Sequence, residues 1–193
     1  MHITAINLRD MARVLAGHPI RDAVRHVPGG DISVVQIKNV DAEAGVDWPA
    51  VTKTVLSSRR KPDWLKPGDI LFSARGQRNV AVCLDQPPAR AVCSPHFFLI
   101  RVKDEKLVLP EFLAWQMNLP LAQRYFSQTA TGSYITSIRR QVLEALLVQI
   151  PSLDRQHLLV RLARAAVHEK QLMQKLMEMR RQELDLVAGK LLA

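Results

Sequence analysis

The sequence predicts an α+β fold, in which a mixed β-sheet domain with flanking helices is followed by one long C-terminal helix of the coiled-coil type. Three observations lead to this prediction. Short apolar runs separated by turn residues lie between about residues 32 and 103, which is typical of strands. Helical spacing begins at Pro110. From Asp154 to Lys190 the chain has no Pro and only one Gly, Gly189, which favours a single uninterrupted helix.

The first half of the chain is predicted from local patterns. Residues 6–16 have helical spacing, and Gly17 is placed to end that helix. Pro67-Gly68 suits the central positions of a type II turn, because glycine supplies the positive φ that this turn needs. Strands are expected at residues 33–37 and 51–56, directly after the Pro67-Gly68 turn, and at residues 80–84, 91–93 and 97–102.

The second half is predicted to be mainly helical. Pro110 opens a helix at the favoured N1 position, and this helix breaks near Pro120 and resumes to about Gln128. A short helix over 138–146 and an apolar strand over 147–150 follow. Pro151 marks the boundary, so we divide the chain into a domain over residues 1–150 and a helix over residues 151–193.

The long helix has a heptad seam. At alternating steps of four and three residues, seven of the ten positions from 158 to 190 are apolar. These seven are Leu158, Leu162, Ala165, Leu172, Leu176, Met179 and Leu186. Exposure of such a long apolar seam to water is unfavourable, so we expect a helix of another chain to pack on it. The alternative is that the helix folds back over the β-domain.

Composition indicates a globular protein with an anionic partner. Of the 193 residues 48% are apolar, which is enough for a core. The 27 Lys and Arg exceed the 18 Asp and Glu, giving a net charge of +9, so nucleic acid is the first expected partner and an anionic membrane the second. No segment resembles a signal peptide or a membrane span. Cys83 and Cys93 lie in apolar runs, which is typical of buried thiols in the cytoplasm.

Motifs for catalysis are missing from the sequence. There is no glycine-rich nucleotide loop and no metal-ligand spacing of His or Cys, so we expect no cofactor, no metal and no catalytic residue. Asp85-Gln86-Pro87-Pro88 is similar to an amino-methyltransferase motif, but Ala89 replaces the stacking aromatic, which favours a proline turn. Asp63 with Asp104-Glu105-Lys106 could form a nuclease site, although charged turns explain these residues better.

Several segments, in their order along the chain, carry a resemblance to a known family. They are residues 8–17, 30–40, 65–76, 110–113, 131–138 and 146–156, with Leu65-Lys66-Pro67-Gly68-Asp69-Ile70 the most recognisable stretch. Together they resemble a half-length specificity (S) subunit of a type I restriction-modification system, with one target-recognition domain. Arg155 departs from the family pattern, which usually has Glu there.

The resemblance implies a non-catalytic DNA-recognition subunit for phage defence. Its domain would read half of a split target in double-stranded DNA, and its helix would dock methyltransferase subunits that carry S-adenosylmethionine. Through them it would reach the motor-nuclease subunit. Family members usually have two recognition domains and two antiparallel helices, so a single copy of each implies an antiparallel homodimer and an inverted-repeat target. A natural half-length subunit and a fragment of a longer one both stay open.

A DNA-reading role directs attention to the basic part of the domain. Residues 53–100 contain eight Lys or Arg against three Asp or Glu, and one loop holds four side chains able to contact base edges. The residues we expect at DNA are Lys53, Arg59, Arg60, Lys61, Arg75, Gln77, Arg78, Asn79, Ser133, Tyr134, Arg139 and Arg140.

Two other functions stay open beside the DNA-reading role. One is a non-catalytic interaction or regulatory module that uses the long helix and binds DNA weakly or not at all. More remote is a metal-dependent nuclease that uses the acidic residues named above.

Overall fold

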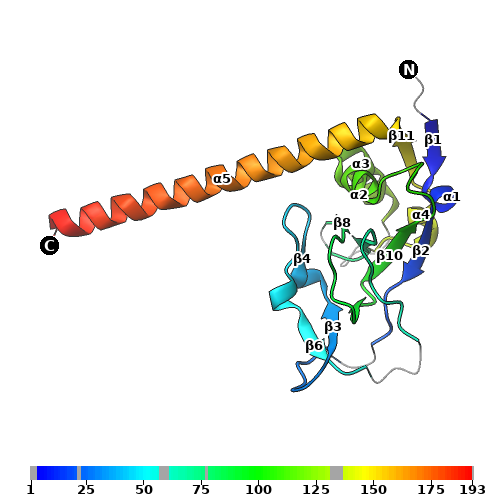
Figure 1. The fold of residues 1–193 in the computed structure, drawn as a ribbon, viewed down its shortest axis with the longest axis horizontal. Helices are drawn as coiled ribbons and strands as arrows, with labels where there is room; N and C mark the ends of the chain where they lie inside the picture. The colour runs from blue at the N-terminus through cyan, green and yellow to red at the C-terminus, as the bar shows by residue number, and fades with distance from the viewer. Residues whose placement is uncertain (1–3, 21–22, 57–60, 77, 131–136, 193) are drawn as a thin grey trace. The chain divides into compact units, whose positions relative to one another are not determined.

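The fold is mixed α+β with one long C-terminal helix, as the sequence predicts (Figure 1). The computed structural model describes residues 4–20, 23–56, 61–76, 78–130 and 137–192. It divides into two compact units, Met1–His157 and Leu158–Ala193. The first unit contains the sheets, and the second consists of most of the long helix. The domain boundary at residue 150 stays a prediction.

The elements of the first unit follow the predicted order closely after residue 30. Its strands are β1 (Thr4–Asn7), β2 (Ala12–Ala16), β3 (Ile32–Val35), β4 (Val40–Asp41), β5 (Gly45–Val46), β6 (Thr52–Thr54), β7 (Ile70–Ser73), β8 (Ala81–Cys83), β9 (Ala91–Cys93), β10 (Phe97–Val102) and β11 (Leu147–Ile150). Its helices are α1 (Leu8–Met11), α2 (Pro110–Asn118), α3 (Pro120–Thr129) and α4 (Arg140–Glu144), with 3₁₀ turns η1 (Ile37–Asn39) and η2 (Trp48–Ala50).

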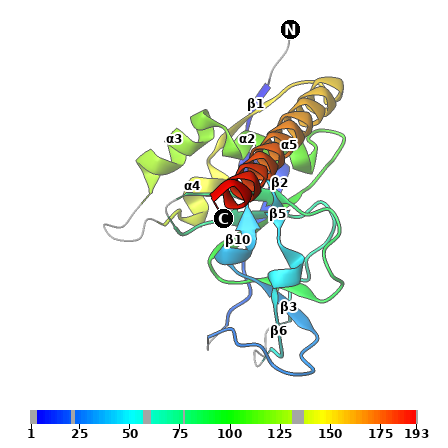
Figure 2. The same cartoon turned by 90° about the vertical axis from the view of Figure 1, so that its left-hand side faces the viewer.

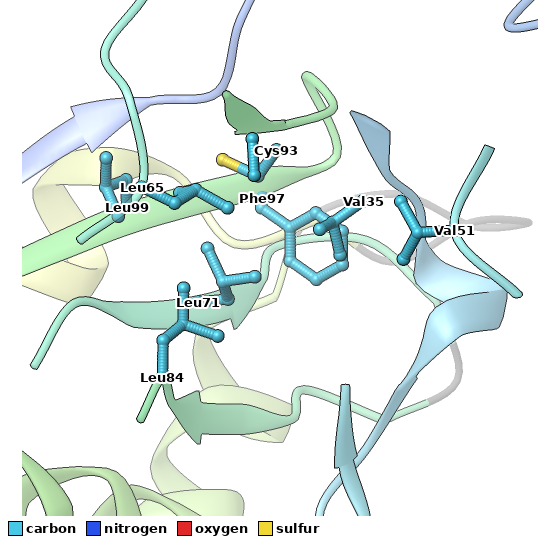
Figure 3. Close-up of a cluster of buried hydrophobic side chains, with 9 residues drawn as sticks. Val35, Val51, Leu65, Leu71, Leu84, Cys93, Phe97 and Leu99 are labelled. Atoms are coloured by element: carbon cyan, nitrogen blue, oxygen red, sulfur yellow. The ribbon is translucent and has the colours of Figure 1, made fainter. Parts of the chain in front are cut away.

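Two sheets form the body of the first unit. The larger has the strand order β2-β10-β7-β8 and is antiparallel, and the smaller has the order β6-β3-β9, in which β3 and β9 run parallel. Figure 3 shows the apolar cluster that both sheets share, with Leu71 and Phe97 from the larger sheet and Val35 and Cys93 from the smaller. Burial of this cluster therefore joins the two sheets into one core.

The turn at Pro67-Gly68 is confirmed. Gly68 has φ of +81°, and the Asp69 backbone N–H donates to the Lys66 carbonyl oxygen at 3.1 Å, which closes the turn. Strand β7 follows at once, and all four of its residues are buried. A turn determined by two residues is local, so the sequence was sufficient to predict it.

The helix expected over residues 6–16 is wrong. Only α1, a single turn, is helical there, and residues before and after it are extended. Strand β2 pairs with β10, from Ala12 opposite Val102 to Ala16 opposite Phe98. The spacing fitted a helix, but pairing with a strand far along the chain decided the conformation.

Gly17 does not cap a helix and is instead needed at a close backbone approach. A Cβ atom at this position would lie 2.0 Å from the carbonyl oxygen of Ser94. The Gly17 backbone N–H donates to the Phe97 carbonyl oxygen at 3.0 Å. Only glycine fits there without moving the Ser94 backbone.

The helices after residue 110 are confirmed. Pro110 is the first residue of α2, and the extended residue Leu119 separates α2 from α3, which begins at Pro120. Figure 2 shows α3 beside α4, where the Tyr125 hydroxyl donates to the Val142 carbonyl oxygen at 2.8 Å. Strand β11 pairs antiparallel with β1, so the two ends of the first unit meet.

The long helix α5 runs without interruption from Leu153 to Leu192, coloured yellow to red in Figure 1. Its first turn belongs to the first unit, where Gln156 is fully buried. The Gln156 side chain accepts from the Leu109 backbone N–H and donates to the carbonyl oxygens of Leu107 and Pro151, each at 2.9 Å. This polar anchor explains why a glutamine lies buried at the start of the helix.

Candidate nucleic-acid interface

The predicted reading loop is a hairpin between β7 and β8 with a well-bonded base. The Ser73 hydroxyl accepts from the Val80 backbone N–H at 2.6 Å and donates to the Arg78 carbonyl oxygen at 3.2 Å. The Asn79 side-chain amide donates to the Ser73 carbonyl oxygen at 2.8 Å. Ser73 therefore ties both sides of the hairpin together, and this short-range network leaves the Arg78 side chain exposed.

Two side chains from the helices hold the returning side of this hairpin. The Gln123 Nε2 group donates to the Asn79 carbonyl oxygen at 2.7 Å and to the Met117 carbonyl oxygen at 2.8 Å. Asn118 bonds to both backbone groups of Ala81, donating to the carbonyl oxygen at 2.7 Å and accepting from the N–H at 3.0 Å. In this way the side chain of Asn118 completes the hydrogen bonding of β8 at the sheet edge.

The structure brings together two stretches of the chain that the sequence predicted separately. Arg75 forms an antiparallel bridge with Ser137, and the Ile138 backbone N–H donates to the Ala74 carbonyl oxygen at 2.9 Å. The start of the hairpin loop therefore lies against the segment that leads into α4. Candidates from residues 75–79 and from residues 139–140 thus belong to neighbouring segments.

The cations in these neighbouring segments differ in what they contact. Arg75, Arg78 and Arg139 are exposed. Arg140 is also exposed, but its Nε group pairs with the Glu144 carboxylate at 2.7 Å on the same helix. An exposed pair of this kind contributes little stability and can exchange Glu144 for a phosphate. Exposed guanidinium groups on these neighbouring segments attract a polyanion.

Other predicted contacts lie elsewhere or outside the described residues. Lys53 is exposed on β6, an edge strand of the smaller sheet, and Lys61 is exposed in the segment before Leu65. Five predicted DNA contacts fall outside the described residues: Arg59, Arg60, Gln77, Ser133 and Tyr134. Whether any of the twelve residues contacts DNA stays a prediction.

The stretch that carries the family resemblance has a structural role around Asp69. The buried Asp69 carboxylate accepts from Arg101, through Nε at 2.7 Å and through a terminal nitrogen at 3.0 Å, and from the Lys66 backbone N–H at 2.8 Å. These hydrogen bonds to Asp69 raise the pKa of Arg101 above its usual value. The same guanidinium donates to the Trp64 carbonyl oxygen at 2.5 Å. Asp69 therefore ties the turn to β10.

Sequence reasoning missed Gln123 and Asn118. Both are polar residues at the junction between two helices, where exposed side chains are usual, so no pattern marked them. Their role depends on β8 lying against α2, and the sequence gives no indication of that contact. The nearest signal was the Pro120 break, which locates the junction without showing what it touches.

Asp104 and Glu105, two of the acidic residues of the nuclease alternative, lie at a turn. The Asp104 carboxylate accepts from the Lys106 backbone N–H at 2.9 Å, which is the geometry of a local Asx turn, as the sequence favoured. Among the described residues, no group of three or more His, Cys, Asp or Glu side chains is placed to hold a metal ion. None of the described helices is both long and apolar enough to cross a membrane.

Within the second unit, the seam residues of α5 are exposed. Leu158, Leu162, Leu172, Leu176, Met179 and Leu186 each expose about half or more of their surface, and Ala165 is also exposed. A second group of apolar side chains outside the seam is exposed as well: Met173, Met177, Leu184, Val187 and Leu191. The apolar surface of the helix is therefore wider than the predicted seam.

Comparisons with known proteins find a likeness of fold to several solved structures, among them three from type I restriction-modification systems. The type I restriction-modification S subunit from M. genitalium matches with a TM-score of 0.63 and 14% identity, over 94% of this chain and 43% of that one. The HsdS subunit from Thermoanaerobacter tengcongensis matches with a TM-score of 0.64 and 15% identity, over 96% and 47%.

The third solved structure concerns complex assembly and conformational transition of the type I restriction-modification system. It matches with a TM-score of 0.54 and 15% identity, over 97% of this chain and 42% of that one. The chain thus has the fold of type I specificity subunits and spans less than half the length of each. No protein-family model and no curated protein sequence matches it.

Proposed function

We propose that this chain is a sequence-specific DNA-recognition subunit of a type I restriction-modification system, acting in the cytoplasm without catalytic activity of its own. The observation that carries the proposal is the likeness of fold over nearly the whole chain to structures of such subunits. The exposed Arg75, Arg78 and Arg139 on neighbouring segments support it, because arginine both neutralises phosphates and contacts guanine edges.

The proposal divides the work between this chain and its partners. The first unit would read half of a split target in double-stranded DNA. The helix α5 would act as a spacer and as a docking surface for methyltransferase subunits, which bind S-adenosylmethionine and methylate adenine. A separate motor-nuclease subunit would join through them. The exposed apolar surface of α5 supports a docking role, since such a surface needs a partner to cover it.

We further propose that two copies pair through the seam of α5 as an antiparallel homodimer. The seven seam residues lie along one stripe of a helix of 40 residues, which is long enough for a stable two-helix contact. A two-fold dimer places two identical recognition domains in opposite orientations. Its target would therefore be an inverted repeat with a central gap.

Selection from random duplex DNA tests the proposal. Purified protein is used first alone and then with a methyltransferase subunit that co-purifies, and the bound sequences are determined at a stated salt concentration. We expect enrichment of a split inverted repeat. Enrichment of one short half-site would keep the recognition role and reject the homodimer. No enrichment in either condition would contradict the recognition role.

The second candidate is an interaction or regulatory module that uses α5. The exposed apolar residues of the helix favour it equally, because they require a partner whether or not the first unit reads DNA. Under this alternative, DNA binding would be weak and would not depend on sequence. The selection experiment therefore separates the two candidates.

A further inference from the structure

The side chain of Gln123 joins the hairpin loop to the junction of two helices. Its Nε2 group has two N–H donors, and both are used, one on the Asn79 carbonyl oxygen and one on the Met117 carbonyl oxygen. Gln123 is half-buried, so water competes for these acceptors less than at the surface. The loop is thereby bonded to the end of α2 as well as to its own strands.

The junction itself is fixed in several ways. Leu119 is extended between the two helices, and its carbonyl oxygen accepts from the Gln123 backbone N–H at 3.0 Å, which places the Gln123 side chain at the first turn of α3. On the other side of Leu119, at the end of α2, Asn118 holds Ala81 through two hydrogen bonds. Asn79, just before β8, and Ala81, its first residue, are therefore held from a single helix junction.

We infer that Gln123 is a positioning residue for DNA sequence selectivity. It fixes the backbone at Asn79 and thereby orients the exposed side chain of Arg78, the adjacent residue. Base-edge contacts need donors placed to within a fraction of an ångström, so a loop that is free to shift accepts many sequences about equally. This inference rests on the proposed function and assigns selectivity to a residue that does not itself contact DNA.

The test compares Gln123→Met with a matched control, Gln116→Met. Gln116 also makes two hydrogen bonds to backbone groups, but to Gln149 in β11, away from the hairpin loop. The readout is the ratio of affinities for the selected target and for random duplex at one salt concentration. We expect Gln123→Met to lower this ratio about tenfold, comparable to the loss of one good base contact, with the affinity for random duplex unchanged.

The control distinguishes positioning from a general loss of stability. Gln116→Met should keep the wild-type ratio, although it removes the same number of hydrogen bonds. A wild-type ratio in Gln123→Met would overturn the inference, and so would an equal loss in both variants. Should Gln123→Met not fold, Gln123→Ala takes its place with the same expectations.

A second measurement needs no DNA. Amide hydrogen exchange in the free protein should be faster at Val80 and Ala81 in Gln123→Met and unchanged there in Gln116→Met. Unchanged exchange in both variants would overturn the inference. A wild-type protein that selects no sequence would overturn the proposed function, and the exchange rates would still decide whether Gln123 holds the loop.

Discussion

Two neighbouring residues of the hairpin loop, Arg78 and Asn79, have different roles: the Asn79 side chain bonds within the loop, and the Arg78 side chain is exposed. Asn79 was predicted as a base reader, yet one of its amide N–H groups bonds to the Ser73 carbonyl oxygen within the hairpin. The carbonyl oxygen of Arg78 beside it accepts from the Ser73 hydroxyl. The amide hydrogen bond holds the half-buried Asn79 side chain to the hairpin, whereas the Arg78 side chain is exposed, so Arg78 is the better placed of the two for base contact.

Substitution of Arg78 by alanine should relax selectivity at one position of the DNA target. The lost contact should cost about 1–3 kcal/mol on the preferred sequence, with little change on random duplex. Lys53→Ala is the comparison, because a phosphate contact should weaken binding to all sequences alike and lower the salt slope by about one. Titrations of both variants at several salt concentrations check this. If Arg78→Ala lowered the affinity for all sequences equally, Arg78 would be a phosphate contact.

The buried thiol of Cys93 should make stability depend on alkaline pH. Burial raises the pKa of Cys93 from 9.0 to about 12. Because the folded-state pKa is raised, the stabilising effect is complete below about pH 9 and is lost as the pH rises from 9 toward 12. The slope in this window should approach 1.4 kcal/mol per pH unit.

Denaturant unfolding of the wild type and of Cys93→Ala at several pH values isolates this effect. The cavity left by the substitution costs the same at each pH, so the difference between the two proteins should shrink as the pH rises above 9. If the free energies of unfolding of the two proteins fell in parallel as the pH rose above 9, the expectation would be wrong. Alkylation of the native protein at pH 8 should modify the half-buried Cys83 before Cys93.

Among the elements, those set by short-range chemistry were predictable, whereas the pattern at β2 suited a helix and distant pairing decided its conformation. Pro67-Gly68 and Pro110 determine a turn and a helix start through their own backbone preferences, and both predictions are confirmed. Strand β2 was predicted as helix, since its partner β10 lies far along the chain. The candidate site shows the same limit, because its cations were visible in the sequence and the supports from Gln123 and Asn118 were not.

The first turn of α5 is an element whose attachment can be tested through Gln156. Gln156→Ala leaves the Leu109 N–H and the Leu107 and Pro151 carbonyl groups without their partner. We expect the free energy of unfolding to fall by at least about 1–3 kcal/mol, because buried backbone groups left without a hydrogen-bond partner keep their desolvation cost. Tryptophan fluorescence in a denaturant titration reports it, since Trp48, Trp64 and Trp115 all lie in the first unit.

Gln174→Ala is the matched control for Gln156→Ala. It removes the same side chain at an exposed position of α5, within the second unit. Its effect on the free energy of unfolding should stay within about 0.5 kcal/mol. A comparable loss in both variants would mean that the buried hydrogen bonds of Gln156 do not determine the effect, since alanine is itself a strong helix former.

At the scale of the whole molecule, the proposed dimer can be tested on α5, which has the predicted seam and a second group of exposed apolar side chains beside it. Leu176 lies on the seam and Met177 lies next to it outside the seam, and both are exposed in the single chain. Leu176→Asp should convert the dimer to monomers by placing a charge in the apolar contact, while Met177→Asp should leave the dimer intact. Sedimentation equilibrium of the two variants measures this. If Met177→Asp alone dissociated the dimer, the dimer contact would belong to the second group of apolar side chains and not to the seam.

The pairing of β1 with β11 has a consequence for biosynthesis. Residues 4–7 leave the ribosome before their partners, residues 147–150, so the backbone groups of β1 stay unpaired with β11 until β11 has been made. An unpaired strand in a nascent chain invites association with other chains. Chains interrupted before Leu147 should therefore aggregate, and the first unit is complete only after β11 has left the ribosome and paired with β1.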